Sequence, residues 1–79
     1  MTHYSHPPLP TLGMERVRWA FNPSANSVVD DIKKETAALI DLCHAMGDKT
    51  NDPEIARCLS LAMTHYEDAA MWAVKAATA

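Results

Sequence analysis

Glycine is scarce in this sequence, and long apolar runs are missing altogether. Only two glycines occur among 79 residues, which argues against a phosphate-binding loop built from consecutive backbone amides. No uninterrupted apolar stretch approaches the roughly 18 residues that a membrane-spanning helix requires. The first residues also lack a basic segment followed by an apolar run, so we expect no secretory signal and a reducing, cytosolic location.

Cysteine and histidine are numerous enough for a zinc site, but their spacing is wrong for one. The two cysteines and four histidines include neither a C-x-x-C pair nor two histidines four residues apart. Cys43 and His44 are adjacent, so on a helix their side chains would point about 100° apart. We therefore expect no metal and no cofactor, and we interpret Cys43 and Cys58 as small, reduced core residues.

Basic charge is also in short supply. Ten acidic residues stand against seven basic ones, which gives a formal charge of −3. Proteins that bind long nucleic acids usually carry a clustered basic excess. We therefore exclude polymeric nucleic acid as a ligand, while a small anionic ligand remains possible because a few well-placed cations suffice for it. The chain has no nucleophile elbow, paired-carboxylate cleft or other catalytic constellation. The sequence therefore predicts a binding protein and not an enzyme.

The first 21 residues predict an irregular arm. Three prolines and Gly13 interrupt any helical period, and only residues 14–21 are expected to form a short helix or an extended turn. This stretch contains two arginines and the aromatics Trp19 and Phe21. Two interpretations stay open: the aromatics pin the arm to the core, or one of them stacks on a base while a neighbouring arginine meets a phosphate.

The next segment, about 23–46, has the apolar period of an amphipathic helix, with its apolar side chains within an arc of about 120°. It starts either at Asn22-Pro23-Ser24 or at a later cap, Ser27 with Asp30. We expect Gly47 to end it in a left-handed conformation. Within it, Lys34 points into the polar face. Lys33 lies at the border of the apolar arc, where a partner element or a ligand would sit.

A polar turn at 47–52 leads to a second helix at about 53–77, capped by Asp52 and started by Pro53. Because the connection is so short, the two helices must form an antiparallel hairpin over residues 22–79. The sequence thus predicts an all-α fold: an arm followed by a two-helix hairpin.

The second helix has a polar line opposite its alanine-rich face. Arg57 and Thr64 are two turns apart on this line, with Ser60 beside them. One interpretation is an ordinary solvated helix face. The other is an anion receptor, since a guanidinium combined with hydroxyls suits phosphate, and copies around a symmetry axis would surround a small polyanion.

Leu61 and Trp72 extend the apolar surface of the same helix sideways. Monomers rarely tolerate such a patch, and a 79-residue chain can bury only a small core. We therefore predict a symmetric homo-oligomer. The alternative is a structural or adaptor hairpin that binds a host or phage protein through Leu61 and Trp72.

Residues 57–76, RCLSLAMTHYEDAAMWAVKA, resemble the C-terminal helix of the phage cyclic-nucleotide sponges. These are small anti-CBASS proteins whose hairpin is shared with the anti-Thoeris sponges, and the similarity covers roughly residues 21–78. The resemblance implies a hexamer that sequesters the messengers of bacterial defence without cleaving them, in the cytoplasm of the infected host.

The resemblance also implies two kinds of pocket. Cyclic dinucleotides such as cGAMP would bind between two protomers, through an N-terminal aromatic and a lysine of the first helix. That lysine falls on Lys33 and the aromatic on Phe21, with Trp19 and Arg18 as competitors. Cyclic trinucleotides such as cyclic tri-AMP would bind where several protomers meet, through an arginine and a threonine of the last helix that fall on Arg57 and Thr64 of the polar line, with Ser60 beside them.

Overall fold

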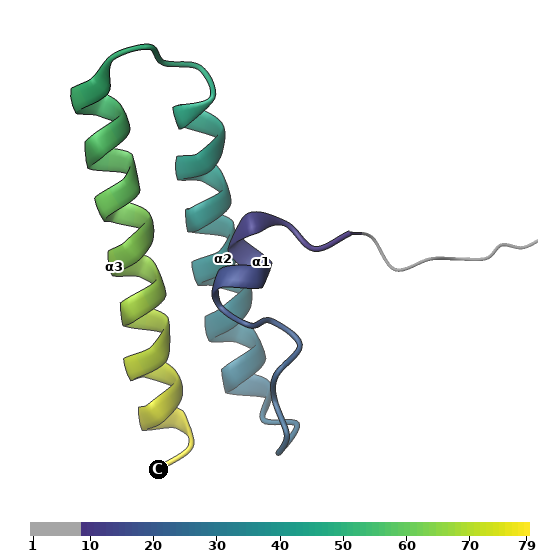
Figure 1. The fold of residues 1–79 in the computed structure, drawn as a ribbon. Helices are drawn as coiled ribbons and strands as arrows, with labels where there is room; N and C mark the ends of the chain where they lie inside the picture. Colours follow the sequence, from purple (N-terminus) through teal and green to yellow (C-terminus); the bar gives the residue numbers. More distant parts are fainter. Residues whose placement is uncertain (1–8) are drawn as a thin grey trace, which may run out of the picture.

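The computed structural model describes residues 9–79, and this part of the chain contains three helices and no strand. Helix α1 spans Leu12–Arg16, α2 spans Ser27–Gly47 and α3 spans Pro53–Ala77. Helices α2 and α3 run antiparallel, and α1 packs on the flank of α2 (Figure 1). The predicted all-α class and hairpin are confirmed. The first eight residues of the predicted arm lie outside the described residues.

Helix α2 starts at Ser27, later than the predicted position of about 23, because the polar residues before it build a turn. The Asn22 side chain accepts from the Asn26 main-chain nitrogen and donates to the Asn26 carbonyl and to Asp30. Ala25 adopts a left-handed φ of 52° within this turn. Asn26 is then the N-cap, and its side chain accepts from the main-chain nitrogens of the first turn.

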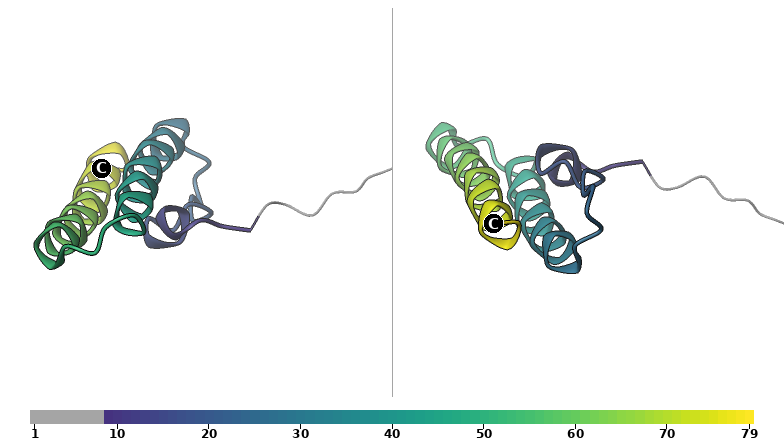
Figure 2. Two further views of the ribbon diagram at one scale, coloured as in Figure 1. Left: turned by 90° about the horizontal axis from the view of Figure 1, so that it is seen from above. Right: turned by 90° about the horizontal axis from the view of Figure 1, so that it is seen from below.

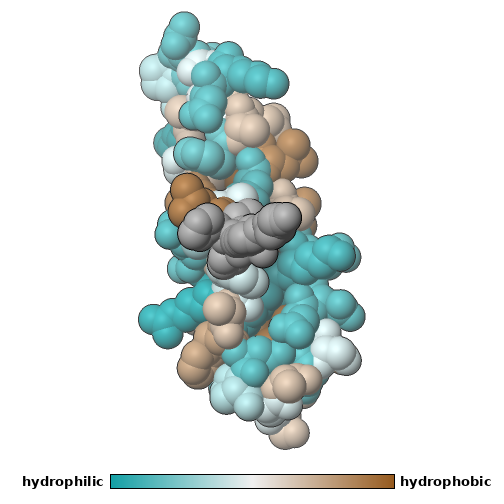
Figure 3. Space-filling model, turned by 90° about the vertical axis from the view of Figure 1, so that its right-hand side faces the viewer, coloured by the Kyte–Doolittle hydropathy of each residue, from teal (hydrophilic) through white to brown (hydrophobic). Residues whose placement is uncertain are grey.

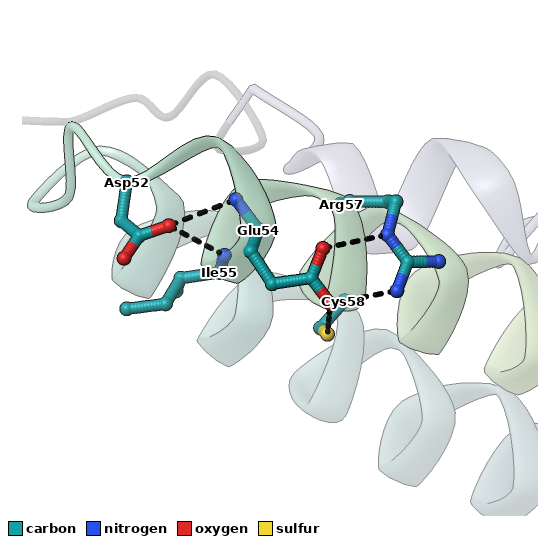
Figure 4. Close-up of polar contacts among 5 residues, drawn as sticks. All are labelled: Asp52, Glu54, Ile55, Arg57 and Cys58. Carbon is teal, nitrogen blue, oxygen red and sulfur yellow. Dashed lines mark hydrogen bonds and ion pairs between the residues drawn. The ribbon is translucent and has the colours of Figure 1, made fainter.

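The hairpin turn confirms one predicted cap and corrects another. The Asp52 carboxylate caps α3 by accepting from the nitrogens of Glu54 and Ile55 (Figure 4), and Pro53 occupies the first turn as expected. The prediction of a left-handed Gly47 is wrong, since no glycine in the described chain has a positive φ. Gly47 instead belongs to the last turn of α2, and Asp48 continues in a right-handed conformation.

Gly13 does not break the arm, as the sequence suggested, but allows α1 to dock on α2. A Cβ atom at position 13 would collide with the Ala37 carbonyl and lie 2.8 Å from Asp41 Oδ1. The Gly13 main-chain nitrogen donates to that same carboxylate oxygen at 2.7 Å. Glycine is therefore needed for close approach of two backbones, and a capping box at Thr11 starts this short helix.

The core lies along α2, where residues from the end of α1 and from α3 pack against it. Helices α1 and α3 flank α2 in the ribbon views (Figures 1 and 2). Val17, which follows α1, packs with Ala37 and Ile40 of α2 and Ala70 of α3. Two alanines at this junction let the helices approach closely. Cys43 is buried as predicted, but the prediction for Cys58 is wrong. Cys58 lies on the outward face of α3, beside the Glu54 side chain.

The core of one chain is small, and much apolar surface stays outside it. Among residues 9–79, eleven large apolar side chains are exposed. On the side of the molecule that carries α1, apolar patches lie between hydrophilic side chains (Figure 3). On this face the apolar side chains form separate patches and not one continuous surface.

Candidate functional site

The linker between α1 and α2 is held against α2 by Lys33. The Lys33 Nζ donates to the carbonyl oxygen of Arg18 at 2.8 Å and also to that of Phe21. Between these two acceptors the chain turns back on itself, with the Phe21 nitrogen donating to the Arg18 carbonyl. Arg18 adopts a left-handed φ of 54°, which costs a non-glycine residue about 1–3 kcal/mol.

Lys33 is a buried cation without an acidic partner in the described chain. Its exposed fraction is 6%, and no carboxylate of residues 9–79 forms an ion pair with it. Burial lowers the pKa of its amine below the ordinary value, the nearby Arg18 guanidinium lowers it further, and Asp30 partly offsets the shift. Since an ammonium has three donors and two are occupied by carbonyls, one donor remains.

A first groove, here called the cationic groove, opens beside Lys33 between the arm and α3. Its volume is about 390 Å³, and its lining residues are Arg16, Val17, Arg18, Lys33, Glu67, Ala70, Met71 and Val74. Three cations face one carboxylate, and that carboxylate is already paired with Arg16 at 2.7 Å. The groove therefore favours an anion with an apolar part.

A second groove, here called the tryptophan groove, lies between the linker and α2. Its volume is about 720 Å³, and it is lined by Met14, Trp19, Ala20, Asp30, Lys33, Lys34, Ala37, Ala38 and Asp41. Trp19 is 43% exposed, so its ring is accessible. An accessible aromatic ring beside a buried ammonium can receive a planar base and a phosphate together.

Phe21 lies elsewhere. It lines a third cavity of about 370 Å³ together with Val29 and Val74, and the Lys33 Nζ lies 5.5 Å from its ring centroid. The structure thus separates the residues predicted for the dinucleotide. Lys33 lines the cationic and tryptophan grooves, Arg18 only the cationic groove, Trp19 only the tryptophan groove, and Phe21 neither of them.

The residues predicted for the trinucleotide, Arg57, Ser60 and Thr64, all lie exposed on α3. The Arg57 guanidinium donates to both carboxylate oxygens of Glu54, at 3.0 and 2.7 Å (Figure 4). This hydrogen bond lowers the pKa of Glu54 and raises that of Arg57. On a single chain these three residues form an open face and line none of the three cavities.

Arg16 is a site residue that the sequence analysis did not single out. Its Nε donates to Glu67 Oε1 at 2.7 Å, and its Nη2 donates to Thr64 Oγ1 at 3.4 Å. The arm therefore contacts both the cationic groove and the polar line of α3. The arginine and aromatic cluster of the arm was the available signal. Its partner in α3, 51 residues further on, could not be identified without the fold.

The flank of α3 carries exposed aromatic and aliphatic surface. Leu61 is 46% exposed and Trp72 is 61% exposed, and the Lys75 Nζ lies 5.1 Å from the Trp72 ring centroid. No cluster of three metal-ligating side chains occurs among residues 9–79. No helix in the same range is long and apolar enough to cross a membrane.

Comparison with known protein families identifies the hairpin. The family model described as the Acb2/Tad1 hairpin domain matches residues 14–78, which includes the last residues of α1, the linker and both long helices. This match extends further towards the N-terminus than the resemblance at residues 21–78 and includes Arg16, Arg18 and Trp19. No curated protein and no solved structure matches the chain.

Proposed function

We propose that this chain, which belongs to the Acb2/Tad1 hairpin domain family of cyclic-nucleotide sponges, sequesters cyclic di- and trinucleotide messengers without cleaving them. The proteins of this family are binding proteins and not enzymes. By holding the messenger, the chain would keep bacterial defence effectors of the CBASS type inactive in the cytoplasm of a phage-infected host.

The observation that carries the proposal is the buried charge of Lys33. Buried charges in proteins are normally paired, yet in the described chain the Lys33 ammonium bonds only to carbonyl oxygens, and the attraction of Asp30 offsets burial and the repulsion of Arg18 only in part. A messenger phosphate supplies the missing negative charge. An ionisable group whose pKa is shifted by burial and that lies beside a cavity is also a typical mark of a binding site.

For the cyclic dinucleotide, we place the phosphate at the free donor of Lys33, with Arg18 as a second cation. Trp19 and Phe21 are the two candidates for stacking on the base. Trp19 has the support of geometry, because its accessible ring and Lys33 line the same groove. Phe21 is 63% exposed and its ring centroid lies 5.5 Å from the same Lys33 Nζ, but it lines a different cavity.

For the cyclic trinucleotide, we place the binding residues on the polar line of α3. Arg57, Ser60 and Thr64 present a guanidinium and two hydroxyls to solvent, and these groups suit phosphate oxygens. A single exposed face gives little affinity, so several copies must converge on one ligand. We propose a hexamer, in which the Leu61 and Trp72 flank is buried between protomers.

Calorimetric titration with cGAMP and with cyclic tri-AMP tests the proposal. We expect both to bind and to be recovered intact on chromatography after incubation. No heat with any cyclic dinucleotide or trinucleotide would refute the sponge function. A hydrolysed product would show that the protein is an enzyme.

The exposure of Leu61 and Trp72 favours one other candidate, an adaptor hairpin that binds a host or phage protein through this flank. Sedimentation separates the two functions. The sponge requires an oligomer, which Trp72→Glu should dissociate while the helical content by circular dichroism stays unchanged. A stable monomeric wild type that binds no cyclic nucleotide would favour the adaptor.

A further inference from the structure

The threonines of the two long helices differ in what their hydroxyl groups contact. Thr36 donates to the Ile32 carbonyl at 2.7 Å, and Thr78, the C-cap of α3, donates to the Val74 carbonyl at 2.8 Å. Such a bond to the carbonyl four residues earlier is the usual partner of a helical threonine. Thr64 makes no such bond within the described chain and instead accepts from Arg16 Nη2 at 3.4 Å.

This difference decides what the Thr64 hydroxyl can do. A hydroxyl has one hydrogen to donate and two lone pairs. The bond from Arg16 occupies a lone pair, and the positive guanidinium repels the hydroxyl hydrogen, which therefore points away from Arg16. No acceptor among residues 9–79 takes that hydrogen. The hydroxyl is left as a free donor on the exposed face of α3.

The guanidinium itself is held in place. Arg16 Nε is paired with Glu67 Oε1 at 2.7 Å, and both side chains are partly buried, with exposed fractions of 26% and 37%. Glu67 and Thr64 are three residues apart on α3 and lie on the same side of the helix. The planar fork of the guanidinium thus spans the two side chains, which fixes its direction toward Thr64.

We propose that Arg16 is a positioning residue for Thr64. It holds the Thr64 hydroxyl as a hydrogen-bond donor to a phosphate of the cyclic trinucleotide, and Glu67 holds Arg16. The inference rests on the proposed function, since it concerns the same α3 site. It adds a residue of the arm to a site that the sequence confined to the last helix.

A double-mutant cycle between Arg16→Gln and Thr64→Val, read by calorimetric titration with cyclic tri-AMP, tests this role. We expect each single substitution to weaken binding about tenfold, the effect of one hydrogen bond to a charged group. The double variant should bind about as tightly as either single variant, because both remove the same donor. If Arg16 only anchors the arm, the two losses of affinity should instead multiply, and the double variant should bind about a hundredfold more weakly than the wild type.

Two further variants keep the test decisive. Glu67→Gln weakens the anchor of Arg16 and should reproduce part of its loss, even where Arg16→Gln lowers the helical content. Thr36→Val is the matched control, because its hydroxyl is already bonded to a carbonyl of α2. It should leave trinucleotide binding unchanged, and the double variant with Arg16→Gln should show the same loss as Arg16→Gln alone.

The outcomes separate this inference from the function on which it rests. If the wild type binds no cyclic trinucleotide, both the proposed trinucleotide site and the role of Arg16 are refuted. If the wild type binds but the losses of Arg16→Gln and Thr64→Val multiply, only the positioning role is overturned. The positioning role is supported if the double variant of Arg16→Gln and Thr64→Val binds as tightly as either single variant and Thr36→Val binds like the wild type.

Discussion

Lys33 reaches back across fifteen residues of sequence to the carbonyl oxygen of Arg18, which lies 2.8 Å from its Nζ. This one contact joins α2 to the linker that carries both candidate aromatics. It also places a buried ammonium at the wall shared by the cationic and tryptophan grooves. The same side chain therefore shapes the linker and supplies charge to the site.

Replacing Lys33 by methionine should separate these two roles. Removing a buried unpaired charge relieves its desolvation, while the Arg18 carbonyl keeps the Phe21 nitrogen as a donor. We expect the free energy of unfolding in urea to change by less than about 1 kcal/mol. Binding of cGAMP should fall more than about tenfold, since a hydrogen bond to a charged group is lost. Lys49→Met, in the hairpin turn, is the control and should change neither quantity.

The affinity for a cyclic dinucleotide should depend on pH in the alkaline range. Burial and Arg18 hold the pKa of Lys33 below its ordinary value of 10.5, so this ammonium loses its proton before an ordinary lysine does. A bound phosphate favours the charged form, and affinity must therefore decrease as pH rises through the pKa of the free protein. Titrations with cGAMP at increasing pH should show this loss.

The matched control for the pH dependence is Lys33→Arg, because a guanidinium stays protonated throughout this range. Its affinity for cGAMP should be flat where the wild type declines. The free energy of unfolding depends on pH in the opposite direction. Between the pKa of Lys33 in the native chain and its pKa in the unfolded chain, the unfolded chain binds more protons than the native one, so the contribution of Lys33 to stability rises with pH. A wild-type affinity that is as flat as that of the arginine variant would contradict the role of Lys33.

Glu54 should compete with the trinucleotide for Arg57. Its carboxylate accepts two hydrogen bonds from the guanidinium, and an anionic ligand must share or displace them. Glu54→Gln should therefore raise the affinity for cyclic tri-AMP, roughly threefold for an exposed pair, whereas Arg57→Ala should abolish most binding. Neither change should affect cGAMP. Equal effects on both ligands would show that the two sites are not separate.

The docking of α1 should be sensitive to a single methyl group. Gly13→Ala places a Cβ against the Ala37 carbonyl, and such overpacking typically costs about 1–3 kcal/mol. We expect faster amide hydrogen exchange in residues 12–21 and weaker cGAMP binding. Gly47→Ala is the control, because its Cβ would meet only Leu59 Cδ1 at 3.8 Å. That variant should be as stable as the wild type or more so.

The hairpin could be predicted from the sequence because its signals are local. The apolar period placed both long helices, and Asp52 with Pro53 marked the start of α3 correctly. Of the two starts left open for α2, the helix takes the later one, at Ser27, because Asn22 looks like a helix cap but closes a turn onto Asn26. Local spacing does not tell which of two successive capping signals starts the helix.

The candidate site could be predicted only in part, for a different reason. Periodicity put Lys33 at the edge of the apolar arc, and the structure buries it there under the linker. The position of Trp19 in one groove and Arg18 in another depends on the left-handed turn at Arg18. Nothing in the residue order signals a left-handed arginine. The contact from Arg16 to Glu67 likewise exists only once three helices have packed.

The wall shared by the cationic and tryptophan grooves limits how many dinucleotide phosphates one chain can bind through Lys33. Lys33 has a single donor left after its two carbonyl bonds, so it can serve one phosphate oxygen at a time. Two anions on opposite sides of the linker cannot both accept a hydrogen bond from this one donor. Each chain can therefore offer the Lys33 ammonium to at most one dinucleotide phosphate, whichever of the two grooves the ligand occupies.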